Sequence, residues 1–225
     1  MKLSLRTVAF VPCLAAFLAI AGSAHADIVT NGALAGSGNT IAGWTVAGTG
    51  ITPGDGITSI TLGPPGPSTP FGDTIPDAPG GTTTAAYFVD DNAAETLSQT
   101  INLTANTAYS LTFDLFGVVS GENNQFNFEL TDSVGAIATS CFANAPMAGC
   151  SSVANGVWTV ETLNFTSGAA GPYNLVFDFT SGDTPAKDVA LTNVAIAATP
   201  EPSSFVLLGS GLLAAAGAIR RRMGV

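Results

Sequence analysis

The sequence has few charged residues, and cations and histidine are especially scarce. Asp, Glu, Lys and Arg make up only 10% of its 225 residues, against about 25% in ordinary soluble domains. Six Lys and Arg residues stand against 16 Asp and Glu, so the formal net charge is -10. Lys187 is the single cation that does not lie close to a terminus. Because nucleic-acid binding depends on many Lys or Arg contacts to phosphate, nucleic acid is excluded as a partner.

The single histidine, His25, lies in a segment that we expect to be removed from the mature protein. A mature chain without histidine cannot contain a serine or cysteine hydrolase site with a histidine base, a histidine-ligated zinc site or a histidine proton shuttle. The composition therefore argues against most enzymes. We expect a protein that is not an enzyme and has no cofactor, apart from the structural calcium considered below.

The N-terminal residues have the three parts of a secretory signal peptide. Lys2 and Arg6 precede an apolar run from Val8 to Ala21, and Ala24-His25-Ala26 supplies an A-x-A cleavage site. We predict cleavage between Ala26 and Asp27, so that residues 1–26 form a signal helix and are removed. The alternative is a buried N-terminal helix.

The C-terminal residues contain a second targeting pattern. Pro200-Glu201-Pro202 interrupts regular structure, a charge-free apolar stretch from Phe205 to Ile219 follows, and Arg220-Arg221-Arg222 comes directly after it. We predict a transmembrane helix of about 25 Å, which is short for a hydrocarbon core about 30 Å thick. The arginine cluster would stop it at the cytoplasmic side. A plain C-terminal membrane anchor is the alternative.

The order of Pro200-Glu201-Pro202, short apolar helix and arginine cluster resembles the PEP-CTERM sorting signal of Gram-negative bacteria. The resemblance covers residues 199–225. It implies export through the inner membrane, transient anchoring there, and processing near Pro200, Glu201 and Pro202 by an exosortase, which is a membrane transpeptidase or protease. It also implies a cell-surface or extracellular location and an association with exopolysaccharide and biofilm.

Residues 27–198 alternate between apolar and polar side chains with the period of two that is typical of β-strands. Nine segments carry this signal: Ile41 to Val46, Ile57 to Leu62, Thr83 to Val89, Leu97 to Leu103, Tyr109 to Leu115, Phe126 to Leu130, Val157 to Phe165, Tyr173 to Phe179 and Val189 to Ala197. We predict an all-β domain, a jelly-roll-like β-sandwich. Its predicted core is Tyr109, Phe113, Phe126, Phe128, Phe165, Leu175 and Phe177.

One segment does not fit this pattern. Between Gly63 and Gly81 the sequence contains Pro64-Pro65-Gly66-Pro67 and three further prolines. Strand ladders do not tolerate that density of proline, so we predict a long surface loop. It is either a binding loop or an irregular excursion.

The domain resembles galactose-binding-like jelly rolls. The segments that carry the resemblance are Leu97 to Leu103, Ala108 to Asp114, Val189 to Val194, Asn31-Gly32 and Gly43 to Val46. In that family the closing strand often has Asp before Asn-Val, whereas this sequence has Thr192. A structural calcium tied to that aspartate is therefore not implied here.

Cys141 and Cys150 are the only cysteines outside the predicted signal peptide. An oxidising exterior permits a disulfide, and the eight intervening residues make a loop that can close. We predict the Cys141–Cys150 bridge. The alternative, a metal-binding or nucleophilic pair, has no histidine partner.

Two kinds of ligand-binding residue can be named from the sequence. Asp90 and Asp91, with Glu95 nearby, supply hard oxygen ligands that suit calcium, although a solvated turn explains them equally well. Trp44, Trp158 and Tyr87 are candidates for stacking on sugar rings, the alternative being that they belong to the core.

Three hypotheses of function follow. The first is an exported, non-enzymatic surface or matrix protein whose acidic surface binds divalent cations that bridge anionic polymers. The second is a carbohydrate-binding module that holds a glycan on a sheet face or between end loops. The third is a secreted acidic hydrolase, which requires two convergent carboxylates in a cleft.

Overall fold

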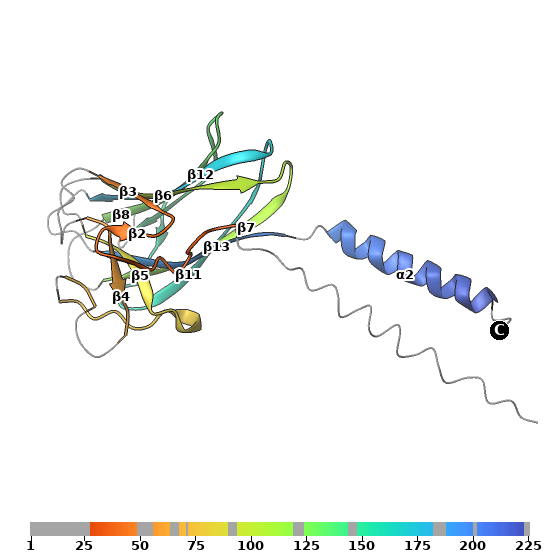
Figure 1. The fold of residues 1–225 in the computed structure, drawn as a ribbon, viewed down its shortest axis with the longest axis horizontal. Helices are drawn as coiled ribbons and strands as arrows, with labels where there is room; N and C mark the ends of the chain where they lie inside the picture. The colour runs from red at the N-terminus through yellow and green to blue at the C-terminus, as the bar shows by residue number, and fades with distance from the viewer. Residues whose placement is uncertain are drawn as a thin grey trace, which may run out of the picture.

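The computed structural model describes residues 28–48, 56–63, 68–70, 72–89, 94–118, 124–143, 148–181, 188–199 and 202–222. Two β-sheets pack face to face as a sandwich, and a C-terminal helix extends beyond it (Figure 1). The predicted all-β, jelly-roll-like sandwich is confirmed. The predicted signal helix, with its cleavage site between Ala26 and Asp27, lies outside the described residues.

The first sheet has six strands in the order β10-β9-β8-β12-β6-β3, and all neighbours are antiparallel except β10 and β9. Its strands are β3 (Thr45–Gly48), β6 (Ala94–Leu103), β8 (Asn124–Thr131), β9 (Ala136–Ala143), β10 (Ser151–Ser152) and β12 (Gly171–Ser181).

The second sheet has five antiparallel strands in the order β11-β7-β13-β5-β4. Its strands are β4 (Thr58–Thr61), β5 (Thr84–Phe88), β7 (Ala108–Gly117), β11 (Trp158–Thr166) and β13 (Val189–Ala198). The remaining elements are β1 (Gly36–Ser37), β2 (Thr40–Ile41), the 3-10 turn η1 (Pro79–Gly81) and the helix α2 (Pro202–Arg222).

The main core lies between the two sheets. All seven predicted core residues belong to it, and every one of them is at most 8% exposed. The ring of Phe177 lies at its centre, in contact with the rings of Phe113, Phe126 and Phe128 at centroid distances of 5.3, 5.8 and 5.7 Å. The period-two alternation of the sequence therefore identified the inward faces of these strands correctly.

A second apolar cluster lies on the outer face of the five-stranded sheet, where the predicted surface loop covers it. Ile75 and Ala78, from the proline-rich segment, are buried there against Phe116 of β7 and Tyr87 of β5. The described part of this segment is irregular, as predicted, but it is packed on the sheet. Its role is to cover an apolar sheet face that would otherwise be exposed to water.

Strand β13 is divided by a bulge at Asn193. Its pairing with β7 shifts register between Thr192 and Ala195, and Asn193 has a φ of 53°. The strand β5 pairs with β13 only over Val189–Leu191, before the bulge. The two halves of β13 therefore have different surroundings.

Candidate ligand site and sorting segment

Two of the three aromatic residues proposed to bind sugar are buried, so this part of the prediction is wrong. Trp44 is 8% exposed, its ring lies 6.1 Å from that of Phe177, and its Nε1 lies 3.1 Å from the carbonyl oxygens of Thr30 and Asn31. Tyr87 is fully buried. A side chain enclosed by protein cannot stack on a sugar ring, and both residues belong to the apolar clusters.

Trp158 is different, because its ring is only partly buried at the edge of the second apolar cluster. It packs against Phe116 with a ring-centroid distance of 5.3 Å, and its Nε1 donates a 3.0 Å hydrogen bond to the carbonyl oxygen of Pro76. These contacts fix the ring between β7 and the proline-rich segment. A partly exposed, immobilised indole is the kind of surface on which apolar sugar faces stack.

A depression of about 420 Å³ adjoins Trp158. Its lining includes Phe116 and Pro76, on which Trp158 packs, together with Asp73, Val118 and Gly156. The Gly156 amide donates a 2.7 Å hydrogen bond to the Gly117 carbonyl, which fixes the loop before β11. The Trp158 depression, as we call it, thus combines an apolar wall with a carboxylate.

Behind this depression the hydroxyl of Tyr87 joins two carboxyl groups. It donates to Asp188 and lies 2.9 Å from Oδ2 of Asp73. Burial raises the pKa of Tyr87 far above its usual value, and the charges of Asp188 and Asp73 raise it further. The phenol therefore stays protonated and holds the proline-rich segment, through Asp73, to the start of β13.

Asp73 is the residue of this group that the sequence did not reveal. The proline density around it indicated a loop, but not the contact with Tyr87, which is 14 residues away. Asp188 directly precedes β13, and the strand pairing of β5 with β13 brings it to Tyr87.

The structure does not show the three predicted calcium ligands together. Asp90 and Asp91 lie outside those residues, and Glu95 is a buried residue of strand β6. Among the side chains that the structure describes, no group of three or more His, Cys, Asp or Glu residues could hold a metal ion. At Thr192 the hydroxyl is buried and donates to the carbonyl oxygen of Thr84 at 2.8 Å, with that of Ala33 at 3.3 Å.

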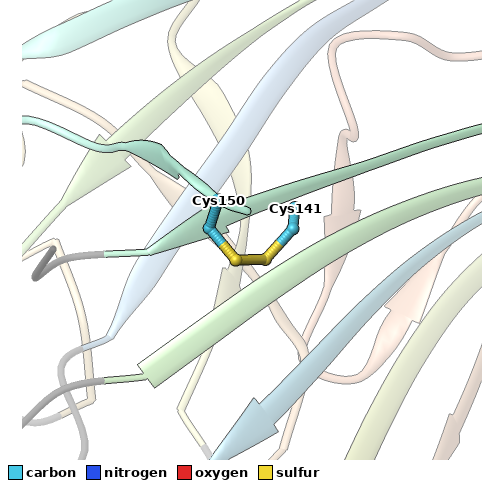
Figure 2. Close-up of a disulfide and its surroundings, with 2 residues drawn as sticks. All are labelled: Cys141 and Cys150. Carbon is cyan, nitrogen blue, oxygen red and sulfur yellow. A yellow bond between two sulfur atoms is a disulfide. The ribbon is translucent and has the colours of Figure 1, made fainter. Parts of the chain in front are cut away.

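The predicted disulfide is present. Figure 2 shows Cys141, on β9, bridged to Cys150, which directly precedes β10. The bridge lines a second depression, of about 450 Å³, beside the side chains of Asn127, Glu129 and Asp178. The disulfide ties the start of the short edge strand β10 to its neighbour β9.

The C-terminal helix was predicted in the correct place, but its predicted transmembrane character is not confirmed. Helix α2 ends in Arg220, Arg221 and Arg222, which suit the negative end of the helix dipole. No helix in the described part of the chain is both long enough and apolar enough to span a membrane. Glycines and serines at Ser203, Ser204, Gly209, Ser210, Gly211 and Gly217 lower its hydropathy.

Three residues separate the end of β13 at Ala198 from the start of α2 at Pro202. Thr199, the residue after β13, donates its amide to the Ala108 carbonyl at 2.8 Å, and α2 begins at Pro202. This strand end, the helix and the arginine cluster together correspond to a known signal. Residues 198–222 are a PEP-CTERM protein-sorting motif. The PEP-CTERM motif marks a protein for export and for sorting by an exosortase, with a surface or extracellular destination. Pro200 and Glu201 lie outside the described residues.

The sandwich is similar to several solved structures, at identities that show the fold alone. A Stig cyclase, Fisc from Fischerella sp. TAU, is 17% identical over 78% of this chain and 98% of its own, with a TM-score of 0.56. The carbohydrate-binding module TmCBM61, solved with β-1,4-galactotriose, is 12% identical over 77% of this chain and 99% of its own, with a TM-score of 0.52.

The enzymatically active domain of tailspike protein 4 from bacteriophage CBA120 is 18% identical over 77% of this chain, with a TM-score of 0.50. This chain spans only 21% of that protein. No curated protein matches this chain in sequence.

Proposed function

We propose that this is an exported, non-enzymatic surface or extracellular protein that binds a polysaccharide of its host's matrix in the Trp158 depression. An exosortase processes it at the PEP-CTERM motif, and the sandwich is the part that is displayed or released. Association with exopolysaccharide and biofilm is part of this proposal.

The observation that carries glycan binding is the position of Trp158. Its indole is partly exposed and is immobilised by Phe116 and by the Pro76 carbonyl. Asp73 lines the depression that adjoins this ring and supplies a carboxyl group to it. An apolar wall with a few polar groups is the usual composition of a ligand site. The fold shared with TmCBM61, a module that holds a galactotriose, supports the same function.

A non-enzymatic role is supported by how the two nearby carboxyl groups are used. A glycoside hydrolase needs one carboxyl group to act as an acid and another to act as a base or nucleophile. Here Asp73 and Asp188 are both engaged by the buried hydroxyl of Tyr87, which ties a loop to a strand. We therefore assign this pair to the stability of the depression. We also propose no resident cofactor.

The experiment that tests glycan binding uses mature protein purified from its host and the extracellular polysaccharide of that host. Trp158→Ala should weaken binding about 30-fold, as truncation of a central aromatic contact commonly does. Val160→Ala is the matched control, because Val160 is 61% exposed on the same strand. Trp158→Phe preserves the packing on Phe116 and should retain part of the affinity. Unchanged binding by Trp158→Ala, or loss of binding only in Glu129→Gln beside the disulfide, would reject this site.

The sorting part is tested separately by the intact mass of protein recovered from the cell surface or medium. We expect the mass of a chain that begins at Asp27 and ends near Pro200, plus the mass of any group attached during processing. Replacement of Pro200, Glu201 and Pro202 by alanine should leave a chain that extends to Val225. Normal processing of that variant would contradict the assignment of the motif as the recognised signal.

A further inference from the structure

The PEP-CTERM motif and the folded sandwich share residues. The motif begins at residue 198, whereas β13 ends at Ala198. Ala198 pairs with Tyr109, and the following amide, of Thr199, donates to the Ala108 carbonyl. The first two residues of the sorting motif are therefore held in the five-stranded sheet.

The part of β13 that follows the bulge is the most weakly held part of this strand. We call Ala195–Thr199 the terminal segment. Among the strands that the structure describes, it pairs with β7 alone, whereas Val189–Leu191 pairs with both β7 and β5. Ile196, 1% exposed, is its one fully buried side chain. Opening the terminal segment thus breaks one ladder and exposes one large apolar side chain.

The connection between the sandwich and α2 is too short to serve as a separate recognition segment. Two residues, Pro200 and Glu201, separate Thr199 from the first residue of α2. Even fully extended, two residues span only about 7 Å. An enzyme that binds an extended peptide uses the backbone N–H and C=O groups of several consecutive residues. On the N-terminal side of Pro200, the groups of the terminal segment that point toward β7 are engaged by that strand, so an enzyme that requires them has to displace β7.

We propose that the exosortase binds the terminal segment as an extended strand, and that it can do so only after Ala195–Thr199 has unpaired from β7. The bulge at Asn193 limits the opening, because it separates the terminal segment from the half of β13 that is paired on both sides. The sandwich as a whole remains folded. This inference rests on the proposed sorting by an exosortase and adds the conformation in which the substrate is bound.

The test links the terminal segment to β7 covalently. Ala197 and Ser110 are directly opposite each other, so the double variant Ser110→Cys/Ala197→Cys places two cysteines across one strand pair. The matched control is Thr45→Cys/Ser98→Cys. These two residues are directly opposite each other on β3 and β6, so their disulfide leaves β13 unchanged. Each full-length variant is produced in the native host, and the intact mass reports both the new disulfide and the processing.

We expect the 110–197 disulfide to leave the chain extending to Val225, and we expect reduction of membrane preparations to restore processing. The 45–98 control should be processed like the unmodified protein. Normal processing of the 110–197 variant would overturn the inference, and so would equal loss of processing in the control. If the unmodified protein itself is not processed, the sorting proposal fails instead.

A second variant should make the unpairing of the terminal segment from β7 easier. Ile196→Ala removes the one large buried side chain of the terminal segment and should accelerate processing about tenfold, because less apolar surface is exposed on opening. Processing at an unchanged rate would count against an opening step.

Discussion

The side-chain amide of Asn193 donates a 2.7 Å hydrogen bond to Oδ2 of Asp114. Asn193 is at the bulge of β13, and Asp114 lies opposite Thr192 on β7. The same asparagine accepts a 2.5 Å hydrogen bond from the Thr82 hydroxyl and donates a 3.0 Å bond to the Pro79 carbonyl. One side chain therefore joins the bulge, the neighbouring strand and the end of the proline-rich segment.

The Asp114→Asn variant should become more stable relative to the unmodified protein as the pH rises. Burial raises the pKa of Asp114, and the hydrogen bond from Asn193 offsets part of that shift. The folded state therefore holds the proton more tightly than the unfolded state, so the unmodified protein loses stability as the pH rises from about 4, the usual pKa of Asp, through the raised value. Asparagine avoids this loss and still accepts the hydrogen bond.

Urea unfolding of both proteins at a series of pH values measures this difference. A difference in unfolding free energy that stays constant from acidic to neutral pH would contradict the expectation.

The Asn193→Ala variant should be destabilised by about 2 kcal/mol or more. It loses the hydrogen bonds to Asp114, Thr82 and Pro79, and alanine tolerates a φ of 53° poorly. Asn193→Gly separates the two causes, since glycine adopts positive φ without strain. Chemical denaturation should rank the stabilities as asparagine, glycine and alanine in descending order. Equal stability of the two variants would show that backbone conformation contributes nothing.

Removal of the disulfide should lower the unfolding free energy by about 2.5 kcal/mol. Cys141 and Cys150 are nine positions apart. Closing a loop of that length lowers the conformational entropy of the unfolded chain, which raises the free energy of the unfolded state by about 2.5 kcal/mol. The double variant Cys141→Ser/Cys150→Ser should therefore melt several degrees lower while keeping its β-sheet circular dichroism. Reduced unmodified protein is the control and should behave in the same way.

Removal of calcium should leave the melting temperature of the sandwich unchanged. Thr192 uses its hydroxyl to bind the Thr84 carbonyl, and Glu95 is buried in β6. Thermal unfolding in excess EDTA and in millimolar CaCl2 provides the comparison. Stabilisation by calcium would point to ligands that include Asp90 and Asp91, and Asp90→Asn/Asp91→Asn should then abolish it.

The sequence predicted the strands in which large apolar residues alternate with polar ones. Phe113, Phe128 and Phe177 mark β7, β8 and β12 in this way, and all three meet in the core. Strand β9 was missed because its inward positions include Ala138 and Ser140, whose small side chains give no periodic signal. Alternation records burial, and a strand near the sheet edge with small residues buries little.

The candidate site was predicted only in part, because it depends on contacts between distant residues. A tryptophan within a strand signal can face the core or the solvent, and the sequence did not separate Trp44 from Trp158. The difference comes from position, since Trp44 lies over Phe177 in the main core and Trp158 starts the edge strand β11. Asp73 and Ile75 were hidden in a proline-rich stretch whose packing no local pattern encodes.

Strand β13 also sets a distance. Its first residue, Val189, pairs with Gly117 beside the Trp158 depression, and its last residue, Ala198, pairs with Tyr109 at the end of the sandwich from which α2 departs (Figure 1). From its first residue to its last, β13 spans about 30 Å at about 3.3 Å per residue. The Trp158 depression and the start of the sorting motif therefore lie at opposite ends of one strand, separated by the length of the sandwich.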